Sequence, residues 1–531
     1  MSSDDDSDFD SQSSDYDSND SSSNSSSGSS SEEDAGEWET IEVPEQDPPH
    51  HPYVFTEHPG PVNPPPRDSS PIVYFMMFCT LDLLQRFVDQ TNRYAEQYPA
   101  SHNLRPRSRA HQWIPTTVTE MKGFIALILN MGIVQLPSIF MYWSTEASIQ
   151  QTFFRRMFRR NRFQLLLKFF HLEDNRNIYP RGHPNYNPIT KYQYLVSFAN
   201  RKFMEHYLPR EYLAIDESMI GSRGRFCYRQ FMPNKRHARF VVKLWLLVES
   251  ASKYCMQFFV YRGRRYDPAP PEGQGYDVVI RLLRVSNLLN RSYHVVVDSF
   301  FCSHRLASAL FAFGTYLTGT IRKNRDIPAA AKVAKPPVGR STYWRNGQSL
   351  LVAFREKASK VVRVLSTCAE ARNVNNKPMV TADIYNPHMC GVDVHDQQLY
   401  VYHDERKTVK VWKKATFNIL SHMLLNAYQI YIQNTDDPNP LCRRRFNSSV
   451  IEALAADHLR AQVVHENAEP LRDGRAAENV QAGVRLLPDR KGKECVVCSH
   501  KNGNGRKRSR TVCVVCERGV HVSCEKRHTH N

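Results

Sequence analysis

The sequence predicts an α/β protein with a helical region ahead of a strand-rich centre and a Cys/His module near the C-terminal end. Three observations support this prediction. Apolar residues recur at three-to-four spacing between residues 71 and 208, as on one face of an amphipathic helix. From Glu211, short apolar runs typical of strands follow one another, with one helical stretch from Val278 to Leu289 among them. Five of the 12 cysteines fall within residues 495–531.

The charge of the chain is unevenly distributed. The formal net charge is +16, and residues 1–60 carry 17 Asp or Glu without any Lys or Arg, which leaves +33 on the rest. Such an excess predicts a polyanionic partner, most commonly nucleic acid, although a ribosomal or membrane surface also fits. The longest apolar run, Phe124 to Val134, is shorter than the roughly 18 residues that cross a bilayer. Without a signal-peptide pattern, we expect an intracellular, reducing environment with few disulfides.

The first 48 residues are rich in Ser, Asp and Glu and contain almost no large apolar side chain. Such a composition predicts disorder, because too little apolar surface is available to offset the entropy of ordering. A Pro-rich stretch follows to about residue 70 and is typical of an extended linker. The fold class therefore includes a disordered acidic N-terminus.

Three aspartates stand where strands or helices would place them at the mouth of a site. Asp216 and Asp298 each follow an apolar strand, and Asp393 shares a helical face with Asp396 at i, i+3. Carboxylates that bridge two divalent cations about 4 Å apart serve phosphoryl transfer, and oxygen ligands favour Mg²⁺ or Mn²⁺. Taken singly, each aspartate is more commonly a strand-end or cap residue with local hydrogen bonds. The acids alone therefore give a hypothesis of a metal site.

Sequence blocks around these acids resemble the piggyBac transposase family. In chain order they are Ile215-Asp216-Glu217-Ser218-Met219 with Arg223-Gly224-Arg225 and Met232-Pro233-Asn234-Lys235-Arg236, Val297-Asp298-Ser299-Phe300-Phe301, Gly319-Thr320-Ile321-Arg322-Lys323-Asn324-Arg325, Tyr385-Asn386 with Gly391-Val392-Asp393 and Asp396-Gln397, and Arg406-Lys407-Thr408 with Trp412. The blocks keep the family's order, and a looser similarity extends from residue 70 to the end.

The resemblance implies an RNase H-like catalytic core with a β-rich insertion, flanked by helical DNA-binding and dimerisation segments. It implies that Asp216, Asp298 and Asp393 bind Mg²⁺ or Mn²⁺, with Asp396 as a further catalytic acid. The implied reaction is cut-and-paste transposition, with strand nicking, hairpin formation on the element's ends and integration at TTAA sites. The implied partners are double-stranded DNA and a second copy of the chain, without a membrane or a small-molecule substrate. The spacing of the acids fits an RNase H-like layout and equally fits chance.

The resulting domain prediction combines composition, periodicity and resemblance. Its segments are a disordered acidic and Pro-rich tail (1–70), a helical dimerisation and DNA-binding domain in two parts (71–208 and 403–465), an RNase H-like domain in two parts (209–318 and 382–402), a β-rich insertion (319–381), a linker (466–490) and a Cys/His-rich zinc-binding domain (491–531).

Basic residues near the acids are candidates for contacts with DNA phosphates, which bind largely without regard to sequence. The candidates are Arg223, Arg225, Lys235, Arg236, Arg322, Lys323, Arg325, Arg406 and Lys407, together with Arg506, Lys507 and Arg508 in the basic loop of the Cys/His module. Trp412 resembles the family's tryptophan beside the active site, where it would stack on a displaced base. The alternative is an ordinary core aromatic of a long helix.

The C-terminal cysteines predict zinc binding. Two CxxC knuckles, Cys495/Cys498 and Cys513/Cys516, each supply two thiolates at the spacing that tetrahedral zinc uses. A cross-brace would place Cys495, Cys498, His521 and Cys524 on one ion and Cys513, Cys516, His528 and His530 on another. His500 competes as the eighth ligand, and a single zinc held by the four knuckle cysteines is the simpler alternative. The module resembles the family's terminal domain that recognises transposon ends; a zinc-held protein-interaction module is the competing interpretation.

Two interpretations of function remain at this point. An active transposase is favoured because each catalytic acid is present, and a domesticated, non-catalytic DNA-binding descendant is the alternative. A different RNase H-like nuclease would fit the acids but neither the flanking blocks nor the Cys/His module. Basic runs at Arg506–Arg508 and Arg443–Arg445 are consistent with nuclear import, so we expect a nuclear protein.

Overall fold

A computed structural model describes residues 37–233, 239–406, 408, 410–468, 484–487, 492–498, 507–513 and 518–528. The chain forms two compact units, Met1–His458 and Leu459–Asn531. The first unit contains the three predicted catalytic aspartates, and the second contains the Cys/His module.

The region predicted to be helical forms six α-helices. They are α1 (Pro71–Phe78), α2 (Leu81–Ser101), α3 (Val118–Ile133), α4 (Thr152–Met157), α5 (Arg160–Phe169) and α6 (Thr190–His206). Local sequence sets their starts: Thr80 and Thr117 cap α2 and α3 by accepting from backbone N–H groups of the first turn. Within the described ranges no single helix is long and apolar enough to cross a membrane. Only α1 and α2 taken together, which are bent by 60° relative to each other, reach that length and apolarity.

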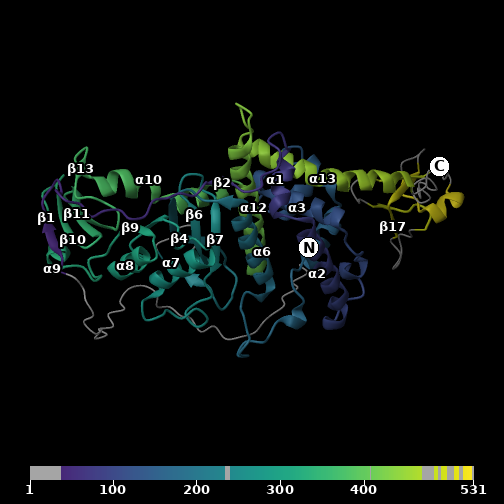
Figure 1. Ribbon diagram of the computed structural model, residues 1–531. Coiled ribbons are helices and arrows are strands. Elements are labelled where there is room, and N and C mark those ends of the chain that lie inside the picture. Colours follow the sequence, from purple (N-terminus) through teal and green to yellow (C-terminus); the bar gives the residue numbers. More distant parts are fainter. Residues whose placement is uncertain are drawn as a thin grey trace. The chain divides into compact units, whose positions relative to one another are not determined.

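The centre of the first unit is a mixed sheet (Figure 1). Its five central strands are β4 (Tyr212–Gly221), β6 (Phe240–Glu249), β7 (Cys255–Val260), β8 (His294–Val297) and β9 (Tyr316–Thr320). They lie in the order β7-β6-β4-β8-β9, with β4, β8 and β9 parallel and β6 antiparallel to both β4 and β7. The short strand β5 (Gln230–Phe231) also pairs with β6. Two helices, α7 (Gln274–Val285) and α8 (His304–Ala312), precede β8 and β9 in the chain.

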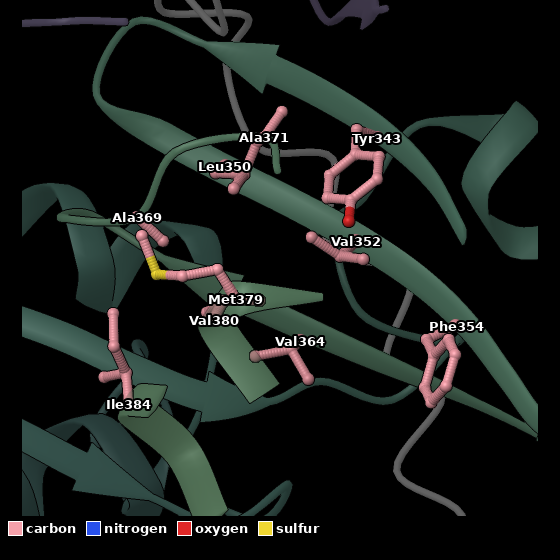
Figure 2. Packing of buried hydrophobic residues seen from close by; sticks show 10 residues of the cluster. All are labelled: Tyr343, Leu350, Val352, Phe354, Val364, Ala369, Ala371, Met379, Val380 and Ile384. Carbon is pink, nitrogen blue, oxygen red and sulfur yellow. The ribbon is translucent and has the colours of Figure 1, made fainter. Parts of the chain in front are cut away.

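The segment predicted as a β-rich insertion extends the same sheet. Its main strands are β10 (Ser341–Asn346), β11 (Ser349–Lys357) and β12 (Lys360–Ser366), preceded by α9 (Ala329–Val333) and followed by the β13–β14 hairpin (Asn373–Val374 and Lys377–Pro378). Strand β12 pairs antiparallel with β9, and the sheet has ten strands when β1 (Glu39–Ile41), which pairs with β10, is included. Figure 2 shows the apolar cluster of this region, in which side chains from β10, β11 and β12 meet Met379, Val380 and Ile384.

Helices after the insertion return to the centre of the sheet. A π-helical turn (Val380–Tyr385) and α10 (Asn386–His388) lead into α11 (Gly391–Val401), which packs against β4 and β6. The long helix α12 (Val411–Asn434) packs against α1, α6 and α11, and α13 follows at Arg443–Ala468. Most of α12 is buried, because apolar residues occupy nearly its whole circumference.

Residues 37–62 form an N-terminal strap along the first unit, drawn in purple in Figure 1. Its strand β1 (Glu39–Ile41) pairs with β10, and β2 (Gly60–Pro61) pairs with β3 (Tyr207–Leu208). Between them, the Tyr53 backbone N–H donates to the Tyr316 hydroxyl over 3.0 Å. The prediction of disorder for residues 1–48 is therefore wrong for residues 37–48; residues 1–36 lie outside the described residues. Residues 37–48 are ordered because β1 pairs with β10, otherwise a strand at the edge of the sheet, although their own composition offers little apolar surface to bury.

A buried ion pair fastens this strap. Glu45 and Arg345 are 7% and 9% exposed, with carboxylate oxygens 2.9 and 2.5 Å from two guanidinium nitrogens. The Ala371 backbone N–H also donates to Glu45, over 2.8 Å. A second strap pair, Glu57 with Arg291 at 2.7 Å, is more exposed.

Replacing Glu45 by Gln is expected to lower the free energy of unfolding of the first unit by about 3–5 kcal/mol, because it leaves the Arg345 charge buried without its partner. The matched change Glu57→Gln is expected to cost no more than about 1 kcal/mol, since its pair is partly solvated. Chemical denaturation of the full chain, followed by tryptophan fluorescence, compares the two variants. Equal losses would contradict the assigned role of the buried pair.

The second unit contains short strands around the cysteines. Strand β15 (Val484–Leu486) pairs with β18 (Thr511–Cys513), and β16 (Lys493–Glu494) pairs with β17 (Arg508–Ser509). A 3₁₀ turn, Val522–Arg527, carries Cys524. A small apolar cluster of Cys495, Cys513, Val520 and Cys524 holds these pieces together.

Candidate catalytic and metal sites

Strand pairing brings two of the predicted acids to one edge of the sheet. Strands β4 and β8 are parallel neighbours in which Ile215 pairs with Val297, so the next residue along each strand direction is Asp216 and Asp298. Each carboxylate accepts a 2.7 Å hydrogen bond from a nearby backbone N–H, that of Glu217 and of Phe300 respectively. The two side chains therefore start from neighbouring, well-fixed backbone positions.

Helix α11 runs alongside β4 and brings the third acid. At its start Gly391 lies so close to the strand that an added Cβ would be 2.7 Å from the Ala214 Cβ, which only glycine avoids. Further along, the Ser218 hydroxyl donates to the Asp396 carboxylate over 2.8 Å. Along α11, Asp393 lies between Gly391 and Asp396. Along β4, Asp216 lies between Ala214 and Ser218, the residues that Gly391 and Asp396 contact. This arrangement places Asp393 level with Asp216, on an exposed part of the helix.

The electrostatics agree with this convergence. The pKa of Asp216 is raised to about 7, mainly by burial; a backbone hydrogen bond from Glu217 lowers it in part, and the negative charges of Asp298 and Asp393 contribute to the increase. Burial likewise raises the pKa of Asp298, and the neighbouring Glu217 charge adds to the increase. Buried carboxylates close to other negative charges are fully ionised near neutral pH only when a positive charge stabilises them. Their oxygen donors suit a hard divalent cation, so the residues present fit Mg²⁺ or Mn²⁺.

Several of the predicted basic residues lie around the same edge. Arg322 is exposed, donates to the Ser299 hydroxyl over 3.3 Å and lowers the pKa of Asp298 through its charge. Arg325 donates to the Phe300 carbonyl over 2.7 Å. Arg223, Arg225 and Lys323 are exposed to solution, as phosphate-binding side chains must be. Lys235, Arg236, Lys407 and Arg506 lie outside the described residues.

Two predicted DNA contacts are buried instead. The Arg406 side chain is 9% exposed and forms an ion pair with Asp404, so it faces the protein interior and not the solution; here the structure differs from the prediction. Trp412 is 7% exposed and packs against His171, with ring centroids 5.0 Å apart. This is the packing of a core aromatic, the alternative interpretation of Trp412, and stacking on a base stays a prediction.

Sequence reasoning missed some of the groups that shape this edge. Lys243 of β6 pairs with Glu217 over 2.8 Å and lies 4.0 Å from the Trp245 ring centroid. The Tyr385 hydroxyl lies 3.4 Å from the Thr320 hydroxyl. Burial is the main cause of the raised pKa of Tyr385, and the negative charges of Asp298 and Asp216 add to the increase. A signal for Lys243 was available, because it is the one charged residue within an otherwise apolar stretch of β6.

The second unit brings together four metal-ligating side chains. One ligand atom from each of Cys495, Cys498, His521 and Cys524 lies within 4.8 Å of the others. This is the set predicted for one ion of the cross-brace, and three thiols with one imidazole suit zinc. Of the second predicted set, Cys516 and His530 lie outside the described residues, so only Cys513 and His528 have positions. Lys507 and Arg508 of the basic loop are exposed.

The polar environment of this cluster favours a thiolate at Cys495 and disfavours one at Cys498. Burial alone would raise the pKa of the Cys495 thiol, but backbone N–H groups, those of His521 and Cys498 among them, outweigh it and lower the pKa to about 6. Burial and the neighbouring thiols raise the pKa of Cys498 to about 11. A bound cation would stabilise the thiolates of all the clustered cysteines together, including that of Cys498, whose pKa the neighbouring thiols raise.

Comparison with known proteins agrees with the geometry. A family model described as "Transposase IS4" matches residues 70–428, well over half of the chain, so the protein belongs to a transposase family. PiggyBac transposable element-derived protein 3 of Homo sapiens is 26% identical over 498 residues, 88% of this chain and 78% of the relative. PiggyBac transposable element-derived protein 2, also of Homo sapiens, is 24% identical over 69% of this chain and 62% of its own. The chain is a member of the piggyBac-type transposases.

A solved structure shares the fold. The cryo-EM structure of a piggyBac transposase synaptic complex with hairpin DNA superposes with a TM-score of 0.69 at 22% identity, over 88% of this chain and 98% of that chain. At this identity the match establishes the architecture, and function has to be argued from the site.

Proposed function

We propose that this protein is a cut-and-paste DNA transposase that excises a mobile element and integrates it at TTAA sites. The steps are metal-dependent strand cleavage, hairpin formation on the element's ends and strand transfer. The observation that supports this most is that the charges of Asp298 and Asp393 both contribute to the raised pKa of Asp216, which puts three acids from separate elements near one another. The strand order β7-β6-β4-β8-β9, with β4, β8 and β9 parallel, supports an RNase H-like catalytic core.

The roles of the chain's own residues follow from their positions. Asp216, Asp298 and Asp393 would hold the cations, and Asp396, fixed by Ser218, would be the accessory acid. When bound, Mg²⁺ or Mn²⁺ supplies activation of the attacking oxygen and stabilisation of the leaving oxygen at phosphorus. Exposed Arg223, Arg225, Arg322 and Lys323 would hold the DNA backbone through salt-dependent phosphate contacts. The structural neighbour is a transposase bound to hairpin DNA, which supports double-stranded DNA as the partner.

A domesticated, non-catalytic DNA-binding protein is the second candidate, since the human relatives carry the name "transposable element-derived". The retention of all three acids in a setting that needs a counter-charge favours catalysis. We also propose a homodimer in the nucleus, as the family resemblance and the basic runs imply.

An excision assay tests the proposed function. A marked DNA segment is placed between the sequences that flank the coding region, and wild-type protein is supplied in cells. The expected result is loss of the segment with a single intact TTAA left at the donor site. Inverted repeats and TTAA at the native flanks without any excision would favour the domesticated DNA-binding protein.

The Cys/His cluster is proposed to hold zinc that organises the second unit for recognition of the element's ends. Replacing Cys524 by Ala is expected to lower bound zinc by one equivalent per chain, because a four-ligand structural site loses its closed tetrahedral shell. Cys442→Ala is the matched control, an exposed free cysteine elsewhere in the chain. Metal analysis of both purified variants by mass spectrometry gives the result. Unchanged zinc in the Cys524 variant would refute the assignment.

A further inference from the structure

A chain of buried hydrogen bonds lies behind the aspartates of α11. His395 of α11 and His422 of α12 are fully buried. The His395 Nδ1 is 2.7 Å from the Lys253 carbonyl oxygen, in the turn between β6 and β7. The His395 Nε2 is 2.8 Å from the His422 Nδ1. One continuous polar chain therefore joins the β6–β7 turn, α11 and α12.

The geometry fixes which nitrogen carries each proton. The Lys253 carbonyl can only accept, so the His395 Nδ1 must donate to it. Two N–H groups cannot face each other at 2.8 Å, so one of the facing nitrogens accepts. With neutral rings the His395 Nε2 is that acceptor, and the His422 Nδ1–H is its donor. A side chain without a donor at position 422 would leave the His395 Nε2 buried and unpaired, which is costly.

Metal binding does not account for this cluster, although the Cys255 thiol lies within 4.8 Å of both rings. Two imidazole nitrogens on one tetrahedral zinc, each about 2.0–2.1 Å from the ion, lie roughly 3.3 Å apart. The 2.8 Å separation found here is that of a hydrogen bond.

The position of His395 gives the chain a functional consequence. His395 lies two residues after Asp393, about 200° around the helix, so its bonds hold the back of α11 while Asp393 faces the open edge. On the side of α11 that carries Asp393, the Asp396 carboxylate is held by the Ser218 hydroxyl, while Gly391, four residues before His395 and on nearly the same face as His395, packs against Ala214. Because α11 is clamped on both sides, neither its rotation nor its distance from β4 can change freely.

We propose that His395 and His422 are positioning residues, which set the rotation of α11 and thereby the place of the Asp393 carboxylate relative to Asp216 and Asp298. This inference rests on the proposed function, since it assigns the pair a role in assembling the cation site. Loss of the His395–His422 bond weakens cation binding, while Arg223, Arg225, Arg322 and Lys323, none of which lies on α11 or α12, keep their positions for binding DNA. Groups that orient metal ligands through hydrogen bonds typically contribute 10- to 100-fold in affinity or activity.

The test compares His422→Phe with His422→Asn in the full-length protein. Phe keeps the ring shape and loses the donor, whereas Asn places an amide nitrogen at the same number of bonds from the backbone as the His Nδ1. Mn²⁺ binding measured by titration calorimetry is the first readout, and DNA affinity measured without divalent ions is the second. His422→Phe is expected to weaken Mn²⁺ binding about tenfold or more, with DNA affinity unchanged within about twofold. His422→Asn is expected to restore Mn²⁺ binding to near the wild-type value.

A second variant covers the case in which His422→Phe fails to fold. His395→Asn keeps the donor to the Lys253 carbonyl and loses the bond to His422, so it should weaken Mn²⁺ binding similarly. Wild-type Mn²⁺ affinity in His422→Phe or His395→Asn would overturn the proposal, as would equal impairment by Asn and Phe at position 422. Absence of Mn²⁺ binding in wild-type protein would refute it together with the proposed function. Mn²⁺ binding without DNA excision by the wild type would refute only the proposed function.

Discussion

Asp298→Asn is expected to reduce magnesium-dependent strand cleavage by at least about a thousandfold, because positioned charge stabilisation at a reacting centre commonly contributes that much. The amide keeps the shape of the carboxylate and can still accept from the Phe300 backbone N–H. It removes the negative charge that a divalent cation needs, so the fold and the basic surface stay intact while the metal site fails.

The measurement is cleavage of a DNA duplex that carries the flanking end sequence, with salt and Mg²⁺ held fixed. Asp82→Asn is the matched control, since Asp82 is an exposed acid in the first turn of α2. DNA affinity should stay within about threefold of the wild type in both variants, as phosphate contacts come from Arg and Lys side chains. Equal cleavage by wild type and Asp298→Asn would refute the metal-site assignment.

Asp216→Asn is expected to stabilise the protein when Mg²⁺ and Mn²⁺ are absent. The raised pKa of Asp216, about 7, means that folding favours the protonated acid over the carboxylate. The contribution of this group to stability is thus fully present below about pH 4, the ordinary range of an Asp, and is lost as the pH rises through 7. Asn carries no charge to bury, so the gain should be largest near pH 8, on the order of 2–4 kcal/mol, and should vanish near pH 4.

Unfolding measured at pH 4.5 and pH 8 in magnesium-free buffer tests this expectation. Added Mg²⁺ should reverse the order at pH 8, because only the wild type retains a complete set of carboxylates to bind it. A variant that is less stable than the wild type at pH 8 without divalent ions would show that Asp216 makes a favourable ion pair instead. That result would remove the electrostatic argument for a cation at this edge.

The sequence predicted the parts of the fold that depend on local pattern. Apolar runs before Asp216 and Asp298 marked two strands, and their pairing as parallel neighbours then places both acids at one edge. Two of the four clustered ligands, Cys495 and Cys498, were predictable from knuckle spacing, because thiols on one tight turn approach one ion without tertiary information; His521 and Cys524 joined them in the prediction only through an assumed cross-brace order.

Features that depend on long-range contacts were not predictable. The composition of residues 37–62 gave no sign of the ordered strap, because its contacts are distant in sequence: Glu45 pairs with Arg345, 300 residues away. Basic character alone suggested that Arg406 faces DNA, whereas the side chain is buried and forms an ion pair with the neighbouring Asp404. The bond between His395 and His422 joins two helices whose packing no local pattern reveals.

The central claim is that carboxylates of Asp216, Asp298 and Asp393 together bind divalent cations. The most direct measurement is an experimental structure of the protein with DNA and Mn²⁺, in which anomalous scattering locates the metal. We predict two Mn²⁺ peaks about 4 Å apart, with oxygens of all three aspartates within about 2.2 Å of one or other ion. Manganese bound elsewhere, with the three side chains directed to separate surfaces, would contradict the account.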